Sequence, residues 1–442
     1  MRKLIVIGVV LLAAVAVWAQ ADDPGANAED RMLTPPPVSG QAYPISLGSQ
    51  ERANSLRYGV MFSSAYSDNA LRSANGYPVS DISYSIWPTI GLDESTSRLH
   101  WGLTYVPGFT FYQHTSSGNQ ADQNATLSFQ YRLSPHVTFS AGDSLQKSSN
   151  VFNQPNPASE SVFGGAQGPN DSVIAPIANQ LRNFGNIGIT YQYSADDMIG
   201  AGGVFGNLYY PDKAQVAGLW DSSSQGGSAF YTHRLSRQHY VGAMYQYQRL
   251  VSYPSGASAE TLANSVFLFY TLYPTAQFSI SFFGGPQHSD TVQPALVSLG
   301  TLAFSMRSWT PAGGASMDWE GHFVGAALNY SHAVSGSGGL IGAVQLDNSS
   351  ATLRLRFTPN LTASISGSYA NNNVLGAAAG VTNGHTDSGT VALNRSIGEH
   401  FGLQLGYMRL HQTYNIASIA GAPNTNREFV SFSYTFTRPL GR

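Results

Sequence analysis

The sequence predicts an all-β protein: a transmembrane, antiparallel, up-and-down β-barrel of about 18 strands. Three observations predict this fold class. The N-terminus has the layout of a secretory leader, charged residues are scarce, and apolar and polar positions alternate from about residue 56 to the end of the chain.

The first 21 residues are expected to be a signal peptide. Arg2 and Lys3 supply the positive start, Leu4–Val17 is apolar, and Ala19-Gln20-Ala21 supplies small residues before a cleavage site. An uncleaved anchor helix is the alternative. The apolar run is, however, shorter than the roughly 20 residues that a spanning helix needs.

Residues 22–55 are polar and interrupted by prolines and glycines, which predicts an irregular periplasmic tail. Residues 56–442 are predicted to form the barrel, an integral protein of the bacterial outer membrane.

The composition separates this chain from ordinary soluble domains. Charged residues make up 11 % of its 442 residues, against about 25 % in typical soluble proteins, which fits a body whose outer surface faces lipid. Without cysteine the chain has no disulfide and no thiolate metal site. A net charge of −3 offers no basic surface for nucleic acid. No cofactor is expected, and no metal site, because the acidic residues of the tail lack the spacing of a calcium loop.

The strands are predicted from alternation with a period of two, which places apolar side chains on one face only. In 125–133, for example, the odd positions are apolar and the even positions are polar. The predicted strands are 56–66, 81–92, 99–112, 125–133, 136–146, 184–194, 198–210, 226–235, 239–252, 262–273, 276–286, 312–320, 322–332, 351–357, 361–369, 387–396, 400–411 and 430–437.

Short and long connections alternate between these strands. Eight short breaks separate nine long ones, such as 147–183, 287–311 and 333–345. Outer-membrane barrels have short periplasmic turns and longer extracellular loops, so the pattern predicts 18 strands with both termini periplasmic; a merged or missed hairpin gives 16. The breaks 147–183 and 287–311 contain apolar residues, which favours either folding into the barrel or packing against each other at its rim.

Aromatic residues near strand ends are expected to form girdles at the membrane interfaces. Examples are Tyr84, Trp101, Tyr105, Tyr131, Tyr191, Tyr193, Tyr273, Trp319, Tyr369 and Tyr434.

The other face of each strand is expected to line a channel, with a wall of Ser, Thr, Gly and Gln and scattered Arg; 18 strands enclose enough room for water. The predicted channel-lining residues are Arg57, His100, Gln130, Arg132, Gln192, Gln246, Asp318, Arg354, Arg356 and Gln404. Arg354 and Arg356 point the same way because they lie two apart on one strand. They either bias the pore toward anions or pair with acidic neighbours and stiffen the wall.

The closing strand, Glu428-Phe-Val-Ser-Phe-Ser-Tyr-Thr-Phe-Thr-Arg438, resembles the C-terminal strand of bacterial outer-membrane proteins. The resemblance implies that Tyr434 and Phe436 form the signal that the barrel-assembly machinery recognises. The chain departs from the pattern because it continues beyond Phe436 to Arg442, whereas such proteins usually end on the aromatic residue.

Residues 50–442 also resemble uncharacterised proteins of the outer-membrane β-barrel porin type, some of which accompany exopolysaccharide secretion. The stretches 129–135 and 431–442 carry this resemblance. It implies a channel role without a named substrate.

Several functions remain open. A passive channel for small hydrophilic solutes is favoured by the polar and wide inner wall. The alternative is a barrel that exports exopolysaccharide with a periplasmic partner. A structural barrel or a membrane-embedded hydrolase is less favoured, and we expect no enzyme, because the spacing of His322, His332, His385 and His400 selects no triad. The expected partners are outer-membrane lipids and the barrel-assembly machinery, and the oligomeric state is left open.

Overall fold

The structure is a computed structural model that describes residues 54–70, 78–148, 179–212, 219–254, 257–295, 303–375, 383–416, 419–421 and 424–440. The predicted signal peptide and all but the end of the predicted tail lie outside these residues. None of the helical structure in the described ranges is long and apolar enough to cross a membrane.

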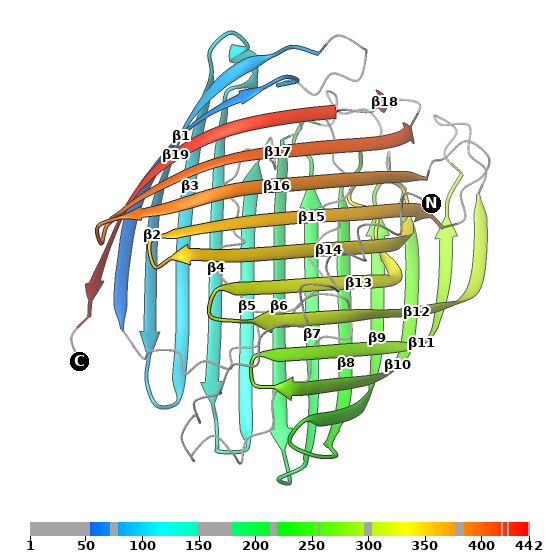
Figure 1. Ribbon diagram of the computed structural model, residues 1–442. Coiled ribbons are helices and arrows are strands. Elements are labelled where there is room, and N and C mark those ends of the chain that lie inside the picture. The colour runs from blue at the N-terminus through cyan, green and yellow to red at the C-terminus, as the bar shows by residue number, and fades with distance from the viewer. Residues whose placement is uncertain are drawn as a thin grey trace, which may run out of the picture.

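The described strands form one antiparallel sheet that closes on itself, as predicted. Consecutive long strands pair with each other, and β1 pairs with β19 from Ser55↔Pro439 to Ser67↔Arg427 (Figure 1). Closure leaves no edge strand, and a hydrocarbon layer would not tolerate one because unpaired backbone groups are costly there.

The wall consists of eighteen long strands, which confirms the predicted number. They are β1 (Ser55–Ser67), β2 (Asp81–Ser95), β3 (Leu99–Tyr112), β4 (Gln120–Arg132), β5 (Val137–Ser148), β6 (Gln180–Gln192), β7 (Asp197–Tyr209), β8 (Ser222–Arg234), β9 (His239–Ser252), β10 (Ala259–Thr275), β11 (Phe278–Gln293), β12 (Phe304–Glu320), β13 (Val324–Gly336), β14 (Ala343–Thr358), β15 (Leu361–Val374), β16 (Gly384–Ile397), β17 (Phe401–Ile416) and β19 (Asn424–Pro439). The short β18 (Ile419–Gly421) pairs with the end of β17, and the 3-10 turn η2 (Ser116–Gly118) lies between β3 and β4.

The connections alternate in length as the sequence predicts. Those at one end of the barrel, the short-turn rim, hold two to four residues, and those at the other end, the long-loop rim, hold six or more. Ser55 pairs with Pro439 on one side and with Asp93, beside the β2–β3 turn, on the other. The barrel therefore begins and ends at the short-turn rim.

The strands extend further toward the long-loop rim than predicted. In the predicted loop 287–311, β11 continues to Gln293 and β12 begins at Phe304; in the predicted loop 333–345, β13 continues to Gly336 and β14 begins at Ala343. Periodicity missed these ends because both faces carry polar residues there, as in Gln287-His288-Ser289-Asp290. The predicted loop 287–311 is therefore too long, because most of it belongs to β11 and β12. Residues 296–302, which include three of the four apolar residues expected to fold inward or pack at the rim, lie outside the described residues. Residues 149–178 of the other predicted loop lie outside the described residues.

The outward face carries a belt of exposed apolar side chains. Tyr58, Ile90 and Tyr105 are partners across β1, β2 and β3, and all three are exposed. The same face continues around the barrel through residues such as Leu127, Ile189, Tyr245, Leu268, Phe282, Ile365, Val391, Leu405 and Phe432. An exposed apolar belt of this kind suits contact with lipid.

Nine of the ten predicted girdle residues lie on this outward face, and Tyr273 does not. Tyr273 is 6 % exposed, packs inside with Met198, and its ring centroid lies 5.5 Å from that of Tyr240. The prediction for Tyr273 is wrong because the segment 266–273 is apolar on both faces, so alternation could not tell its inside from its outside.

Candidate channel interior

The ten predicted channel-lining residues all project to the inner face of the sheet. Side chains of directly opposed residues in antiparallel strands share a face. His100 is opposite Gln130, and Arg57 is opposite Gly91, which lies between the outward residues Ile90 and Leu92. The same registers place Arg132, Gln192, Gln246, Asp318, Arg354, Arg356 and Gln404 inside.

Arg354 and Arg356 have different surroundings although both point inward. Arg354 Nη2 forms an ion pair with Glu320 Oε1, across β13 from it. Arg356 is exposed, and within the described residues no carboxylate lies at ion-pair distance from it. The ion pair of Arg354 therefore supports the hypothesis that it stiffens the wall. Arg356 keeps a charge that is not neutralised, which supports the hypothesis that it attracts anions.

The inner face is not uniformly polar, which corrects the predicted wall of small polar residues. On β10 to β12, Phe267, Phe269 and Ala312 form a buried cluster, and Phe283 packs against it. The rings of Phe267 and Phe283 meet edge to face at 5.6 Å between centroids. The interior of this side is therefore filled by packed side chains.

Another inward aromatic residue, Trp87, packs against a glycine. Trp87 on β2 is 1 % exposed and lies over Gly108 of β3. A Cβ at position 108 would lie 2.1 Å from the indole ring, so only glycine admits this packing.

The end of the β13–β14 hairpin leans into the barrel. Pairing between β12 and β13 ends at Gly313↔His332, whereas β13 stays paired with β14 up to Gly336↔Ala343. Val334 is completely buried and packs against Leu250 of β9 and Ala263 of β10, which are inward residues of strands on the far side of β12. The hairpin end therefore lies over the inner face of its neighbours.

Hydrogen bonds fix the hairpin tip, which we define as Ser337–Gly342. Tyr210 Oη donates to the Gly338 carbonyl at 3.0 Å, and the Trp220 amide donates to the Gly339 carbonyl at 2.7 Å. The Gly342 amide donates to Ser252 Oγ at 2.9 Å. The tip is thus fastened to the β7–β8 connection and to the end of β9.

The side chain of Gln287 on β11 links the hairpin to β10 by hydrogen bonds. Its Oε1 accepts a hydrogen bond of 2.9 Å from the Val334 amide, and its Nε2 donates to Ser265 Oγ at 3.0 Å. Gln287 is 2 % exposed, so both ends of its amide are satisfied inside the protein. The sequence signals for this hairpin were weak, because 333–345 looked like any glycine-rich loop.

β12 and β13 separate toward the long-loop rim. Above Gly313, β12 has no partner on its β13 side among the described residues. Its outward Arg307 is 77 % exposed and pairs with Asp290 of β11 at 3.0 Å. Because unpaired backbone and exposed charges are both costly in hydrocarbon, this part of the wall belongs in the headgroup or aqueous layer.

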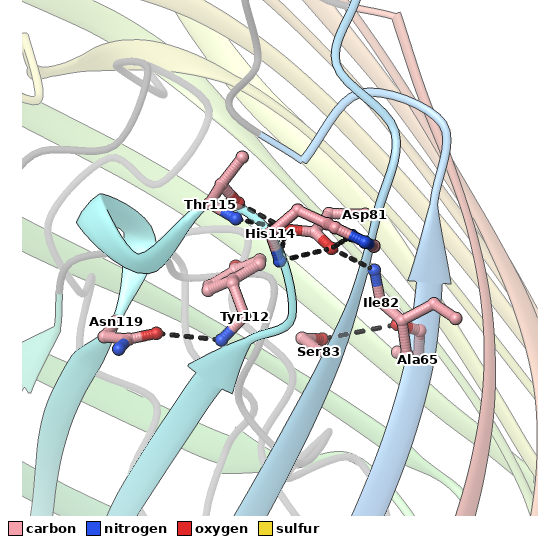
Figure 2. Close-up of polar contacts among 8 residues, drawn as sticks. All are labelled: Ala65, Asp81, Ile82, Ser83, Tyr112, His114, Thr115 and Asn119. Carbon is pink, nitrogen blue, oxygen red and sulfur yellow. Dashed lines mark hydrogen bonds and ion pairs between the residues drawn. The ribbon is translucent and has the colours of Figure 1, made fainter.

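A buried carboxylate fastens another loop at the long-loop rim (Figure 2). The side chain of Asp81 has no exposed surface. It accepts hydrogen bonds from the Ile82 amide at 2.7 Å, the His114 amide at 3.1 Å, the Thr115 amide at 2.8 Å and Thr115 Oγ1 at 2.6 Å. The Tyr112 amide donates to Asn119 Oδ1 at 2.8 Å in the same loop. The donors come from β2 and the β3–β4 loop, so Asp81 holds that loop against the wall. Sequence reasoning missed it because the donors are distant in the chain.

The four histidines weighed for a hydrolase lie apart. His332 contacts Asp347 and Gln345, and His400 Nδ1 lies 3.2 Å from the Thr435 carbonyl. Among the described contacts none joins His322, His332, His385 or His400 to a serine hydroxyl.

No family model and no curated protein sequence matches the chain. Solved structures do show a likeness in fold. OccAB4 of Acinetobacter baumannii is 10 % identical, with 88 % of this chain and 100 % of that chain covered and a TM-score of 0.42. OccK2 (OpdF) of Pseudomonas aeruginosa is 10 % identical, with 87 % and 98 % covered and a TM-score of 0.43. The ferric citrate transporter FecA in its unliganded form is 10 % identical, with 86 % and 78 % covered and a TM-score of 0.41. All three TM-scores are below 0.5, so these likenesses assign no function to the chain.

Proposed function

We propose that the chain is a porin-like channel of the bacterial outer membrane that lets small hydrophilic solutes pass. The single observation that carries this proposal is the contrast between the two faces of the closed sheet. Outside lies an exposed apolar belt, while inside several polar side chains remain exposed. Examples of exposed inner residues are Thr126, Gln130, Ser140, Thr352, Arg354 and Arg356.

Exposed polar residues of the inner face lie on β4, β5, β14, β15 and β19, away from the packed aromatic cluster of β10 to β12, and Glu320 adds one more at the short-turn end of β12. In an aqueous pore these polar groups would exchange hydrogen bonds with water and cost little to leave exposed. We therefore place the water path along the β14-to-β5 side of the interior, with the β13–β14 hairpin tip beside it at the long-loop rim. Arg356 gives this path a positive charge, which favours anions.

The membrane location and its partners belong to the same proposal. The apolar belt fits contact with outer-membrane lipids. The short-turn rim, where β1 begins and β19 ends, fits the periplasmic side. Tyr434 and Phe436 lie on the outward face of β19, where Tyr434 packs against Phe401 at 5.1 Å between ring centroids. Their role in assembly is proposed from the resemblance of the closing strand.

Exopolysaccharide export is not proposed. It would require a continuous basic or aromatic track through the interior, whereas Phe267, Phe269 and Phe283 are packed against one another and buried or half-buried.

The test is single-channel recording in planar bilayers, using full-length protein refolded in detergent and shown to be folded by its shifted mobility on an unheated denaturing gel. We expect discrete, ohmic current steps with a preference for anions. Folded protein that inserts but yields no steps above the bare bilayer would overturn the proposal.

A further inference from the structure

Three potential metal ligands meet on the outer face of the barrel near the long-loop rim. His385 and Asp387 lie two apart on β16, so they project to the same side. His411 on β17 is directly opposite Asp387 in the register. Val391 and Tyr407, which lie lower on the same face, are exposed members of the apolar belt. The group therefore sits above that belt, on the outside of the wall.

The ligand atoms of the three residues lie close enough to share one ion. One nitrogen or oxygen atom from each lies within 4.8 Å of the others. His385 Nε2 is 3.9 Å from Asp387 Oδ2, and the rings of His385 and His411 are 5.7 Å apart. Ligand atoms around a tetrahedral zinc ion are about 3.3 Å apart, given metal–ligand distances of about 2.0–2.1 Å. Rotation of half-exposed side chains can close this difference while the paired strands stay in place.

His411 already has the partner that a metal-bound histidine needs. Its Nδ1 contacts the side-chain oxygen of Asn424, on the other side of β17 in β19. A ligating imidazole usually donates its second N–H to such an oxygen, which fixes the ring and its tautomer. Its Nε2, 3.2 Å from Thr413 Oγ1, is then the nitrogen directed toward a metal.

We propose that His385, Asp387 and His411 bind one divalent transition-metal ion of the zinc class. Two neutral imidazoles and a carboxylate suit Zn²⁺ and its neighbours in the series, whereas Ca²⁺ and Mg²⁺ prefer sites made of oxygen alone. Three protein ligands leave one position for water. The bound ion ties β16 to β17 at the rim.

Other histidine–carboxylate pairs show why this group is different. His233 Nδ1 lies 2.8 Å from Asp197 Oδ1, also on the outward face, and His332 contacts Asp347. Each of these pairs has a single histidine, and among the described residues only the His385 group brings three such ligands together. The expectation of no metal site rested on the tail carboxylates and did not consider these residues, because only strand pairing brings His411 beside residues 26 and 24 positions earlier.

The experiment is a titration of refolded full-length protein with ZnCl₂, in competition with a chromophoric zinc chelator. The protein carries no histidine tag and is first treated with EDTA. The variants are His385→Ala, Asp387→Asn and His411→Ala. His233→Ala is the matched control, because it removes a histidine that contacts an outward-facing carboxylate without a second histidine.

We expect one zinc ion per chain with micromolar or tighter affinity, and weaker Mg²⁺ binding by at least 100-fold. Each of the three variants should lose at least 10-fold in zinc affinity, and His233→Ala should match the wild type. Zinc should also raise the temperature at which the wild-type barrel loses its gel shift, and the His411→Ala variant should lose this increase. Absence of saturable binding, or unchanged affinity in both His385→Ala and His411→Ala, would overturn the proposal. Because the gel shift reports folding separately, a variant that fails to fold is recognised, and the remaining two variants decide.

Discussion

The Tyr210 hydroxyl donates a hydrogen bond of 3.0 Å to the Gly338 carbonyl oxygen, which lies 128 residues further along the chain. This bond joins the residue after β7 to the tip of the β13–β14 hairpin, six strands away around the wall. Tyr210 is 2 % exposed, so if one partner is removed, the other cannot form a replacement hydrogen bond with bulk water. The position of the hairpin tip inside the barrel therefore depends on contacts that can be removed one at a time.

Tyr210→Phe should loosen the hairpin tip. The variant leaves the Gly338 carbonyl buried without this donor, which costs on the order of 1–3 kcal/mol. In single-channel recordings we expect more frequent current fluctuations than in the wild type, because the tip lies beside the proposed water path. Tyr84→Phe, on the exposed outer face, is the control and should leave the record unchanged. Identical fluctuations in Tyr210→Phe and the wild type would show that the tip does not gate the current.

Gly339→Ala should destabilise the same tip by another route. Gly339 has a φ of +109°, and a Cβ there would lie 2.7 Å from the Tyr210 hydroxyl oxygen. Strain of this kind costs about 1–3 kcal/mol. Urea unfolding of the refolded barrel, followed by tryptophan fluorescence, should show an earlier midpoint. Gly336→Ala is the matched control in the same hairpin, because a Cβ there meets nothing within 4 Å. Equal midpoints for the two variants would contradict the described tip.

Arg356→Gln should reduce anion preference more than Arg354→Gln does. The Arg354 guanidinium is paired with Glu320, while Arg356 has no carboxylate partner in the described part of the wall. We expect the reversal potential in a salt gradient to move toward zero in Arg356→Gln and to change less in Arg354→Gln. Glu320→Gln should move it in the opposite direction, since it frees the Arg354 charge. A larger effect from Arg354→Gln than from Arg356→Gln would reverse the assignment of the two residues.

Asp81→Asn should release the β3–β4 loop. The carboxylate accepts hydrogen bonds from three backbone amides and the Thr115 hydroxyl, and an amide nitrogen in place of one oxygen would face donors. Losing buried, charge-assisted hydrogen bonds costs on the order of 1.5–3 kcal/mol each. Limited proteolysis of the folded barrel should cut this loop faster in the variant. Asp290→Asn, which removes an ion pair with the exposed Arg307, is the control and should not change the rate of cleavage. Equal rates of cleavage in both variants would show that Asp81 does not anchor the loop.

The strands near the short turns could be predicted from the sequence, and parts of the interior could not. The segment 125–133 alternates cleanly because one face meets lipid and the other does not, so its faces follow from the residues alone. In 266–273 both faces are apolar, since Phe267 and Phe269 pack inside while Val266 and Leu268 are exposed outside. Alternation carries no signal in such a strand.

The sites formed by strand pairing could not be predicted from the sequence either. The inward lean of 333–345 depends on partners such as Tyr210 and Ser252, and the metal-ligand group depends on the register that sets His411 opposite Asp387. Local patterns contain neither relationship. Conversely, the ten inward residues followed from alternation because a one-residue change of face would have exposed them to lipid.

The most direct test of a water-filled interior uses single cysteines in a chain that has none. Gln130 and Leu127 lie on β4, with Gln130 on the inner face and Leu127 on the outer belt. Gln130→Cys and Leu127→Cys are inserted in planar bilayers and exposed to a charged, membrane-impermeant thiosulfonate while current is recorded. We predict rapid modification of Gln130→Cys with a stepwise fall in current, and no change for Leu127→Cys. Unchanged current in Gln130→Cys, or equal modification of both, would contradict a channel lined by the inner face.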